Sequence, residues 1–470
     1  MKRNYFTDPL DLITVNRLDV AFRLLYLKYR KLNLSLAKSY YYEILKIQTL
    51  NKLIDPDNKD KSNFQDFLNY FESLLDSITK KGFDPSVSTI PLADDGSILN
   101  GSHRLAIALF LGGKVCVARK PLEKVDCSSE YLKRFGIQDS LMESAIVNLL
   151  GYSSKFRVIV LWPSSDKTIS KTSLKIFKNV FYTKEIELTE LGKINFLFEL
   201  YNHMDWIGSP SNNFRGIRQK VGECFPVNNK RKVKLLLVKE KEDGSEDVQL
   251  QKEQFRKLAG LGYSSVHSTD NTQESIALTR LSLSEPGLHF INYANLSRFN
   301  FRKRARSISD ILIHHDIDPE HILFTGSIVL EAYGLRESND LDYLSLGDLS
   351  DYFGPSHDSQ LNFYPSNKLD LLFSSDNYFW FEGIKIISLR VLTEMKRKRG
   401  EEKDTYDLQL LSSFQETQLK KNYLTGLKTR FYFLKVRVEN KIYKLIVSTL
   451  NFLRVKKAAK NFFLFLKSKL

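Results

Sequence analysis

The sequence predicts a multidomain α/β protein, and three observations lead to this prediction. The chain has 470 residues, which is more than one ordinary domain core contains. Hydrophobic residues make up 42% and charged residues 27%, the balance of a globular protein and not of a mainly disordered one. From residue 83 onward, short apolar runs typical of strands alternate with stretches of helical periodicity.

The first 80 residues are expected to be helical. Apolar residues recur at helical spacing in LDVAFRLLYLKYRKL and again in FQDFLNYFESLLDSI. The segment around Pro56 separates the two stretches, as a turn would. We therefore assign residues 1–80 to a helical N-terminal region.

Residues 81–150 read as a small α/β domain. STIPLA predicts a strand, followed by an Asp-Gly turn and a short second strand. HRLAIALFL predicts a helix, which Gly112-Gly113 ends, and KVCVAR predicts the next strand. The helix start collects polar groups suited to an anion, because helix N-termini offer free N–H groups and arginine adds a bidentate donor. We expect a phosphate or nucleotide to bind at Asn100, Gly101, Ser102, His103 and Arg104.

This segment resembles the ParB/sulfiredoxin-like fold, whose phosphate-binding turn reads Gly-x-His-Arg or Gly-x-Arg-Arg. Ser102 stands where sulfiredoxin has its reactive cysteine, so sulfiredoxin chemistry is not expected. No helix-turn-helix segment follows, which argues against a role in chromosome partition. The alternative is a plain glycine turn in which His103 caps the helix and Arg104 is paired at the surface.

Residues 151–295 are expected to form a further α/β region of unknown role. His267, Asp270 and Glu274 lie close together in the sequence, but a metal site would need another ligand, so a polar turn before a helix is favoured. The run NNFRGIRQKVG is interpreted as a solvated basic face. Strands are predicted in RVIVLW, EIELTE and KVKLLLVKE, and helices in GKINFLFELYNHM and around EQFRKLA.

Residues 322–344, ILFTGSIVLEAYGLRESNDLDYL, carry the most informative pattern. Asp340 and Asp342 lie two residues apart, so on a strand they share a face and suit Mg²⁺ or Mn²⁺ between them. Gly326-Ser327 at a helix start can contact a phosphate. Asp370, in the apolar run NKLDLLF, is expected on a neighbouring strand. Two acids would hold the metal and Asp370 would act as the base in transfer at phosphorus. The alternative is a plain turn beside a solvated acidic loop.

This arrangement resembles the DNA polymerase β-type nucleotidyltransferase superfamily, whose pattern is Gly-Ser, Asp-apolar-Asp and a later strand Asp. The downstream segment FEGIKIISLRVLTEMKRKRGEEKDTYDLQLL, expected to contain one long helix over 388–414, is similar to minimal nucleotidyltransferases and LicD-like phosphotransferases. The resemblance implies a nucleotidyltransferase-like domain at 296–420 and a nucleoside triphosphate or activated nucleotide as donor. Many members keep the fold without catalysis. The further residues that it implies in donor binding or in the helix are Arg336, Lys396, Arg399, Lys403, Asp404 and Asp407.

The net charge of +15 is concentrated in a C-terminal tail. Residues 421–470 contain 13 Lys and Arg and one acid, a net +12, which leaves +3 for the other 420 residues. Apolar residues including Val455, Phe462 and Leu466 fall on one helical face. We expect this basic amphipathic tail to contact an anionic membrane surface, the alternative being a terminal helix packed on the protein's own core.

The cysteines and the hydropathy pattern indicate the cellular compartment in which the protein is expected. The three cysteines form no CxxC pair and are too few for a disulfide framework. No run of 18 apolar residues occurs, and acids interrupt the N-terminal segment, so neither a spanning helix nor a secretion signal is expected. We expect a cytoplasmic protein, peripheral at the inner face of the plasma membrane through its tail.

Taken together, the motifs favour a Mg²⁺-dependent nucleotidyl- or phosphotransferase. The order of units is similar to proteins of bacterial surface-polysaccharide gene sets, which implies a sugar, polyol or glycan acceptor in capsule or envelope biosynthesis. Two alternatives stay open: a nucleic-acid-binding protein with a basic tail, which we favour less, and a catalytically inactive scaffold.

Overall fold

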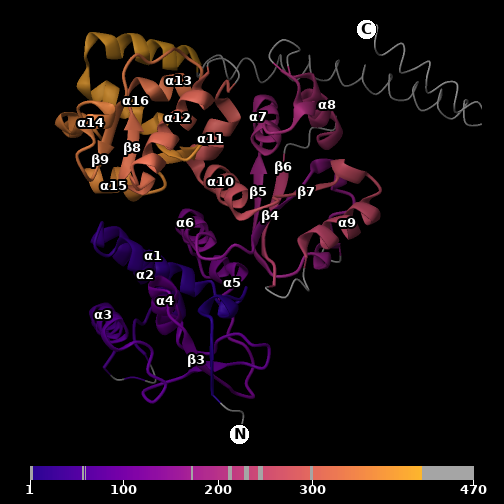
Figure 1. The fold of residues 1–470 in the computed structure, drawn as a ribbon, viewed down its shortest axis with the longest axis vertical. Coiled ribbons are helices and arrows are strands. Elements are labelled where there is room, and N and C mark those ends of the chain that lie inside the picture. Colours follow the sequence, from indigo (N-terminus) through magenta and orange to yellow (C-terminus); the bar gives the residue numbers. More distant parts are fainter. Residues whose placement is uncertain are drawn as a thin grey trace, which may run out of the picture.

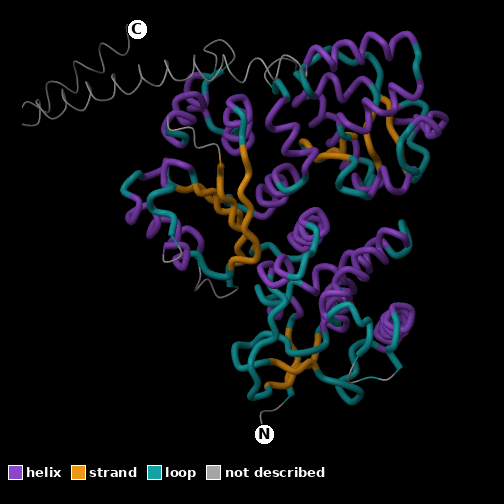
Figure 2. The backbone as a smooth tube through the Cα atoms, turned by 180° about the vertical axis from the view of Figure 1, so that it is seen from behind, coloured by secondary structure: helices purple, strands orange, loops and turns teal. Residues whose placement is uncertain are grey.

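The computed structural model describes residues 4–55, 58, 60–170, 173–209, 214–226, 232–241, 247–296 and 300–414. These residues form a mixed α/β structure with three small sheets, as the sequence predicts at this level (Figures 1 and 2). The predicted basic tail at 421–470 lies outside the described residues. None of the helices in the described ranges has the length and apolar character needed to cross a membrane.

The N-terminal unit is built around one almost fully buried helix, α1 (Asp19–Tyr29), which packs against three other helices. Its sheet has the order β1-β3-β2, with β1 antiparallel and β2 parallel to β3. Because β1 precedes α1 and β3 follows it by many residues, the regions predicted at 1–80 and 81–150 share one sheet. The other elements are β1 (Tyr5–Thr7), α2 (Leu34–Gln48), α3 (Phe64–Lys81), β2 (Ile90–Leu92), α4 (Ser102–Leu111), β3 (Val115–Arg119), α5 (Ser129–Arg134) and α6 (Asp139–Leu150).

The middle unit is an antiparallel sheet of order β5-β6-β4-β7 that is buried on both faces. Side chains of β4 alternate between two cores, because successive residues of a strand point to opposite faces. Val158 and Val160 belong to the main core, whereas Ile159 and Leu161 face a smaller core under α9. The elements are β4 (Phe156–Leu161), β5 (Val180–Glu187), α7 (Glu190–Tyr201), α8 (Arg215–Cys224), β6 (Lys232–Lys239), α9 (Val248–Ala259), β7 (Val266–Ser268), α10 (Thr272–Ser282) and α11 (Glu285–Tyr293).

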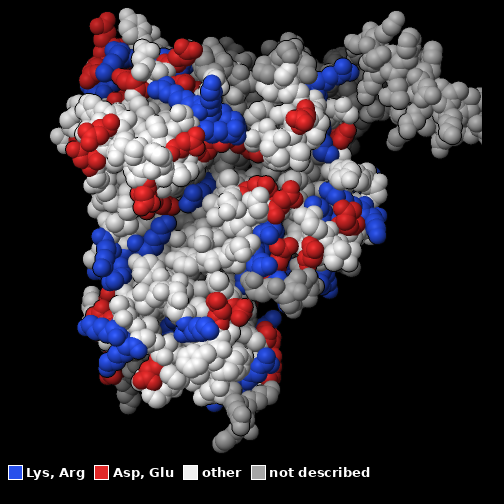
Figure 3. All heavy atoms as spheres, viewed as in Figure 1, with Lys and Arg blue, Asp and Glu red and all other residues white. Residues whose placement is uncertain are grey.

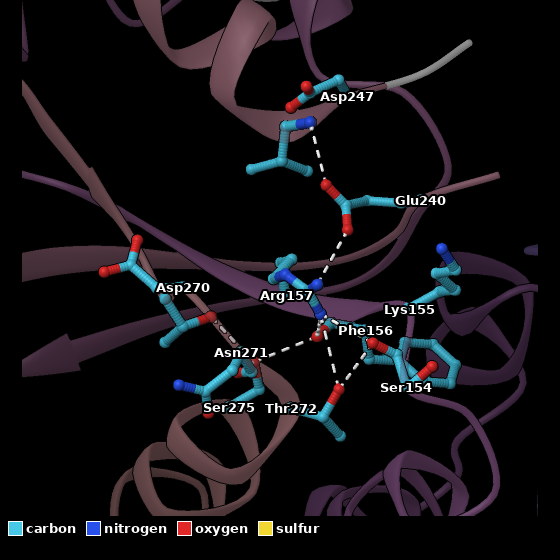
Figure 4. Close-up of polar contacts among 12 residues, drawn as sticks. Ser154, Lys155, Phe156, Arg157, Glu240, Asp247, Asp270, Asn271, Thr272 and Ser275 are labelled. Carbon is cyan, nitrogen blue, oxygen red and sulfur yellow. Dashed lines mark hydrogen bonds and ion pairs between the residues drawn. The ribbon is translucent and has the colours of Figure 1, made fainter. Parts of the chain in front are cut away.

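Arg157 ties together three segments at one end of this sheet. Its guanidinium pairs with Glu240 at 3.1 Å and donates to Thr272 Oγ1 at 3.4 Å and to the Ser154 carbonyl at 2.9 Å (Figure 4). Glu240 follows β6 and Thr272 begins α10, so one side chain fixes the start of α10 against the sheet.

The third unit has a four-stranded sheet of order β10-β11-β8-β9, in which β11 runs parallel to β8 and the other pairs are antiparallel. Strand β8 is central and wholly buried. Its elements are α12 (Phe301–His314), β8 (Ile322–Thr325), α13 (Ser327–Ala332), β9 (Asp342–Ser345), α14 (Ser350–Phe353), α15 (Lys368–Phe373), β10 (Tyr378–Phe381), β11 (Ile384–Ile387) and α16 (Leu389–Arg399).

The prediction of one long helix over 388–414 was wrong. Helix α16 ends at Arg399, and Gly400 adopts the left-handed conformation with φ of 68°, which closes the helix through a hydrogen bond to the Lys396 carbonyl. A second helix then runs over 402–414. The glycine therefore turns the chain back, so that Asp404 reaches the last turn of α16.

Glu320 joins the three units. Its Oε1 lies 3.3 Å from Lys28 Nζ of α1 and 3.1 Å from Arg280 Nη2 of α10, and β8 begins two residues after it. Burial alone would raise the pKa of Glu320, but Lys28, Lys385 and Arg280 lower it to about 2. One main core of buried apolar side chains also runs through all three units.

Replacing Glu320 by glutamine should lower the free energy of unfolding at pH 7 by about 2–3 kcal/mol, because two cations lose their shared counter-charge. The folded pKa lies below the unfolded value of about 4.3, so the ionic contribution is complete above that pH and is lost as pH falls toward 2. Urea unfolding between pH 2 and 7 should show the wild type and Glu320→Gln converging in acid. As a control, Glu394→Gln removes the exposed pair with Arg390 and should change stability little. Equal effects of the two substitutions would contradict the assignment.

Candidate active site

The strongest candidate site lies where β8 ends and β9 begins. Thr325, the last residue of β8, pairs with Asp342, the first of β9. Gly326 then adopts φ of 68°, and a Cβ placed there would lie 2.0 Å from Asp342 Oδ2. The Asp342 carboxylate therefore rests directly on the Gly326 backbone, and only glycine permits both the conformation and the close approach.

Asp340 was predicted to share a strand with Asp342, but β9 begins at Asp342 and Asp340 lies in the loop before it. Two hydroxyl groups, one at the start of α13 and one in the loop, hold Asp340 in place. Ser327 Oγ donates to Asp340 Oδ1 at 3.1 Å, and Ser338 Oγ donates to the Asp340 carbonyl at 2.7 Å. The two hydroxyls also lie 2.6 Å apart. The structure thus brings together four predicted residues, Gly326, Ser327, Asp340 and Asp342, and it uses the Ser327 hydroxyl to position a carboxylate.

A histidine that the sequence analysis did not identify is linked by hydrogen bonds to the end of β8. Tyr364 Oη is 2.8 Å from Thr325 Oγ1 and 2.8 Å from His357 Nδ1, so a hydrogen-bonded chain leads from β8 to the imidazole. Burial lowers the pKa of His357, Asp342 opposes this effect, and cations including Arg399 add to the lowering. No sequence motif marks His357, because its place beside Asp342 arises only from the fold. Among the described residues, none donates a hydrogen bond to the Asp342 carboxylate.

The prediction that Asp370 lies on a strand beside the acid pair was wrong. Asn367 Oδ1 accepts from the Asp370 N–H at 3.0 Å, and Asn367 Nδ2 donates back to Asp370 Oδ2 at 2.5 Å, so this segment begins α15 with a reciprocal cap. Asp370 Oδ1 accepts from Asn33 Nδ2 at 2.9 Å, in the N-terminal unit. Helix α15 ends at Phe373, whose ring lies edge-on to His321, the residue before β8.

The predicted donor-binding cations are mostly held by the protein's own acids. Buried Lys396 pairs with Asp404 at 2.9 Å and with Asp407 at 2.8 Å, and Arg336 forms a bidentate pair with Asp407 at 2.7 and 2.9 Å. Burial would raise the pKa of Asp404, but Arg399 and Lys396 lower it to about 2. These groups therefore fix the helix at 402–414 against α16. Lys403 is exposed and pairs with Glu401 at 3.1 Å.

At the predicted anion-binding turn before α4, the protein's own side chains already bond most of the groups that an anion would contact. Gly101 is left-handed with φ of 93°, and Asn100 Oδ1 accepts the Gly101 N–H at 2.6 Å. Ser102 Oγ accepts a hydrogen bond from Arg17, whose guanidinium also pairs with fully buried Asp19 at 2.9 Å. Burial would raise the pKa of Asp19, but its arginine partners hold it well below its usual range. An internal carboxylate and guanidinium thus take up the space beside Ser102.

His103 and Arg104 fit neither interpretation of this turn, the phosphate site or the plain glycine turn with a histidine cap and a paired arginine. His103 neither caps the helix nor faces solvent: it lies 2.7 Å from Tyr41 Oη and edge-on to Phe71, and burial lowers its pKa well below the usual value. Arg104 donates to the Thr89 carbonyl at 3.0 Å and makes no ion pair with a carboxylate of the described chain. Of the five predicted residues, Arg104 alone keeps a charge available at this turn.

Comparisons of the chain with protein-family models, with curated proteins and with solved structures give no match. Within the described ranges, no group of three or more His, Cys, Asp and Glu side chains is arranged to hold a metal ion by itself. The chemistry of the site therefore rests on the pair Asp340–Asp342, on Gly326 and on His357.

Substituting Gly326 by alanine should destabilise the protein by about 1–3 kcal/mol, because a Cβ there meets Asp342 and the conformation disfavours L residues. Gly347 is a matched control on the far side of β9, where a Cβ meets nothing within 4 Å and φ is not positive. Thermal unfolding followed by circular dichroism should separate the two variants. A Gly326→Ala protein as stable as Gly347→Ala would show that the close approach is not present in solution.

Proposed function

We propose that the chain is a Mg²⁺- or Mn²⁺-dependent nucleotidyl- or phosphotransferase that acts at Asp340 and Asp342. The single observation that carries the proposal is the Asp342 carboxylate, which rests on Gly326 with no hydrogen-bond donor among the described side chains. Asp342 is half-exposed, so water can hydrate its carboxylate in the empty protein, and a divalent cation can replace that water between the two acids.

The residues present fit a Mg²⁺ ion. This ion commonly takes one or two protein carboxylates and completes its shell with waters and substrate phosphates, so a two-carboxylate site needs no third protein ligand. Asp340 and Asp342 would hold it, with Ser327 keeping Asp340 in position. When bound, the ion would neutralise charge on the transferred phosphoryl group.

His357 replaces Asp370 as the proposed proton acceptor. Its Nδ1 is engaged by Tyr364 at 2.8 Å, which leaves Nε2 as the nitrogen that can act on substrate. Its lowered pKa keeps the imidazole neutral at pH 7, the form that accepts a proton from an attacking hydroxyl. Asp370 is instead a capping and packing residue of α15.

The acceptor and setting remain part of the same proposal. The motif resemblance supports a sugar, polyol or glycan acceptor in capsule or envelope polysaccharide assembly, with a nucleoside triphosphate or activated nucleotide as donor. Lys396 and Arg336 are neutralised by Asp404 and Asp407, so these two residues add no cationic track for a nucleic-acid backbone. The basic tail, on which the nucleic-acid alternative rests, lies outside the described residues. A scaffold without catalysis is the remaining alternative, since Asp370 is engaged elsewhere.

Asp342→Asn should abolish metal-dependent nucleotide binding and lower any transfer rate by about 100-fold or more, because the ion loses a charged ligand. Asp370→Asn is the matched control and should retain both properties. Binding can be measured by calorimetry with Mn²⁺ and a nucleoside triphosphate, and retained nucleotides can be identified by mass spectrometry. If both variants behave as wild type, or if the wild type binds no nucleotide with metal, the scaffold interpretation replaces the transferase.

His357→Gln should lower transfer by about 100-fold while leaving metal-dependent nucleotide binding intact, since a general base contributes to the chemical step. The acidic limb of the pH–rate profile, which reports protonation of the base, should also disappear. Equal loss in binding and in rate would assign His357 to the ligand shell instead. His314→Gln, at an exposed position on α12, provides the matched control.

A further inference from the structure

A cavity of about 540 Å³ opens in the middle unit between α8, α9 and the edge strand β7 (Figure 1). All of its lining residues belong to this unit, so the cavity is separate from the site at Asp340 and Asp342. The lining residues that carry the inference are Trp206, Lys220, Lys252, Arg256, Tyr263 and His267.

Lys252 occupies an apolar position of an amphipathic helix. Val248 and Phe255 face the small core under the sheet, and Lys252 lies four residues after the first and three before the second, on the same face of α9. Only 8% of Lys252 is exposed. Its Nζ donates to Ser268 Oγ at 3.0 Å, and no described carboxylate lies within ion-pair distance. A buried ammonium without a counter-charge is costly, and burial accordingly lowers the pKa of Lys252.

Arg256, one turn further along α9, adds a second incompletely satisfied cation. Its Nε is buried and has no hydrogen-bond partner, while Nη1 pairs with Glu253 and Nη2 donates to the Val266 carbonyl at 3.4 Å. The guanidinium carbon lies 4.5 Å from the centre of the Tyr263 ring. On the opposite wall, Lys220 Nζ of α8 donates to the Tyr263 carbonyl at 3.1 Å. Over the surface that α9 forms, Figure 3 shows Lys and Arg side chains interspersed with Asp and Glu.

The acids near the cavity neutralise this charge only in part. Glu223 is occupied by Lys220 at 3.5 Å and by the Ser264 hydroxyl at 3.0 Å. Asp270 also lines the cavity and favours the charged form of Lys252, but it is exposed and forms no ion pair with that lysine among the described residues. Burial and the neighbouring cations lower the pKa of His267 to about 3, so the imidazole is uncharged at pH 7. The cavity therefore presents donors and positive charge to whatever fills it.

Two aromatic rings line the cavity and remain accessible. Trp206 is 45% exposed and Tyr263 is 75% exposed. Gly216 allows the Trp206 segment to pack directly on α8, since a Cβ there would lie 1.8 Å from the Trp206 carbonyl. Exposed rings beside buried cations suit a ligand that combines a planar group with phosphate, because rings stack and cations form charge-assisted hydrogen bonds.

We propose that this cavity binds a nucleotide, with its phosphates at Lys252 and its base against Trp206. This site is distinct from the proposed metal site, and the proposal does not depend on the transferase function. It also gives a role to the middle unit, for which no sequence motif predicts a function.

The test is calorimetry of the full chain in metal-free buffer, so that binding at Asp340 and Asp342 does not contribute. The probes are inorganic pyrophosphate, uridine diphosphate and adenosine diphosphate. Lys252→Met should weaken all of them at least about tenfold, since a charged hydrogen bond is lost. Trp206→Ala should weaken the nucleotides and leave pyrophosphate unchanged. Lys257→Met, which removes an exposed lysine of the same helix, should bind as wild type.

The Lys252→Met protein is expected to fold, because the substitution replaces a buried charge by an apolar side chain of similar length. Its melting temperature at or above that of the wild type would confirm this. Three results would overturn the proposal: no probe binds the wild type, Lys252→Met binds as tightly as the wild type, or neither nucleotide binds more tightly than pyrophosphate. The last result would leave a phosphate site without a base contact.

Discussion

The shared carboxylate of Glu320 is the constraint on which the arrangement of the three units depends. It draws Lys28 from the N-terminal unit and Arg280 from the middle unit to the start of the central strand of the third. Beneath it, the buried ammonium of Lys385 donates to the Glu320 and Leu372 carbonyls. Because β8 is only four residues long, fixing its start also fixes Gly326 at its other end. The geometry of the candidate active site is therefore set partly by residues of the other two units.

The predictions from sequence succeeded where the information is local. The strand before Gly326 and the strand that Asp342 begins lie within one stretch of chain, and the structure pairs them, although Asp340 lies before β9 and not on it. Strands β4 and β6 of the middle unit were also predicted, since burial on both faces gives them the continuous apolar runs VIVL and LLLV, whereas β5 was predicted only at its end. Strand β1 could not be found in this way: it has three residues, and its partner β3 lies more than a hundred residues further along the chain.

The errors came from partners that only the tertiary structure chooses. Asp370 lies in an apolar run that suits a strand, but Asn367 three residues earlier offers a reciprocal cap, and the helix start is satisfied locally. This signal was present in the sequence and was outweighed by the family pattern. For Lys396 no such signal exists, since a lysine that binds phosphate and one that binds Asp404 and Asp407 look alike in a sequence. His357 was missed for the same reason.

Charged groups that find partners inside the protein are structural, and charged groups without such partners are the candidates for function. Asp19 and Lys396 are buried but have opposite charges at hydrogen-bond distance, and Lys385 has two carbonyls and lies near three aromatic rings. Such groups stabilise the fold and are not free to bind a ligand, whatever motif they belong to. Asp342 and Lys252 differ, because the first has no donor among the described residues and the second has one hydroxyl and faces a cavity. Burial of Lys252 without an ion-pair partner raises the free energy of the empty protein, and an anionic ligand recovers that free energy on binding, whereas half-exposed Asp342 is left free to take a cation in place of water. This asymmetry, rather than motif membership, is the physical reason to look for a cation at one position and an anion at the other.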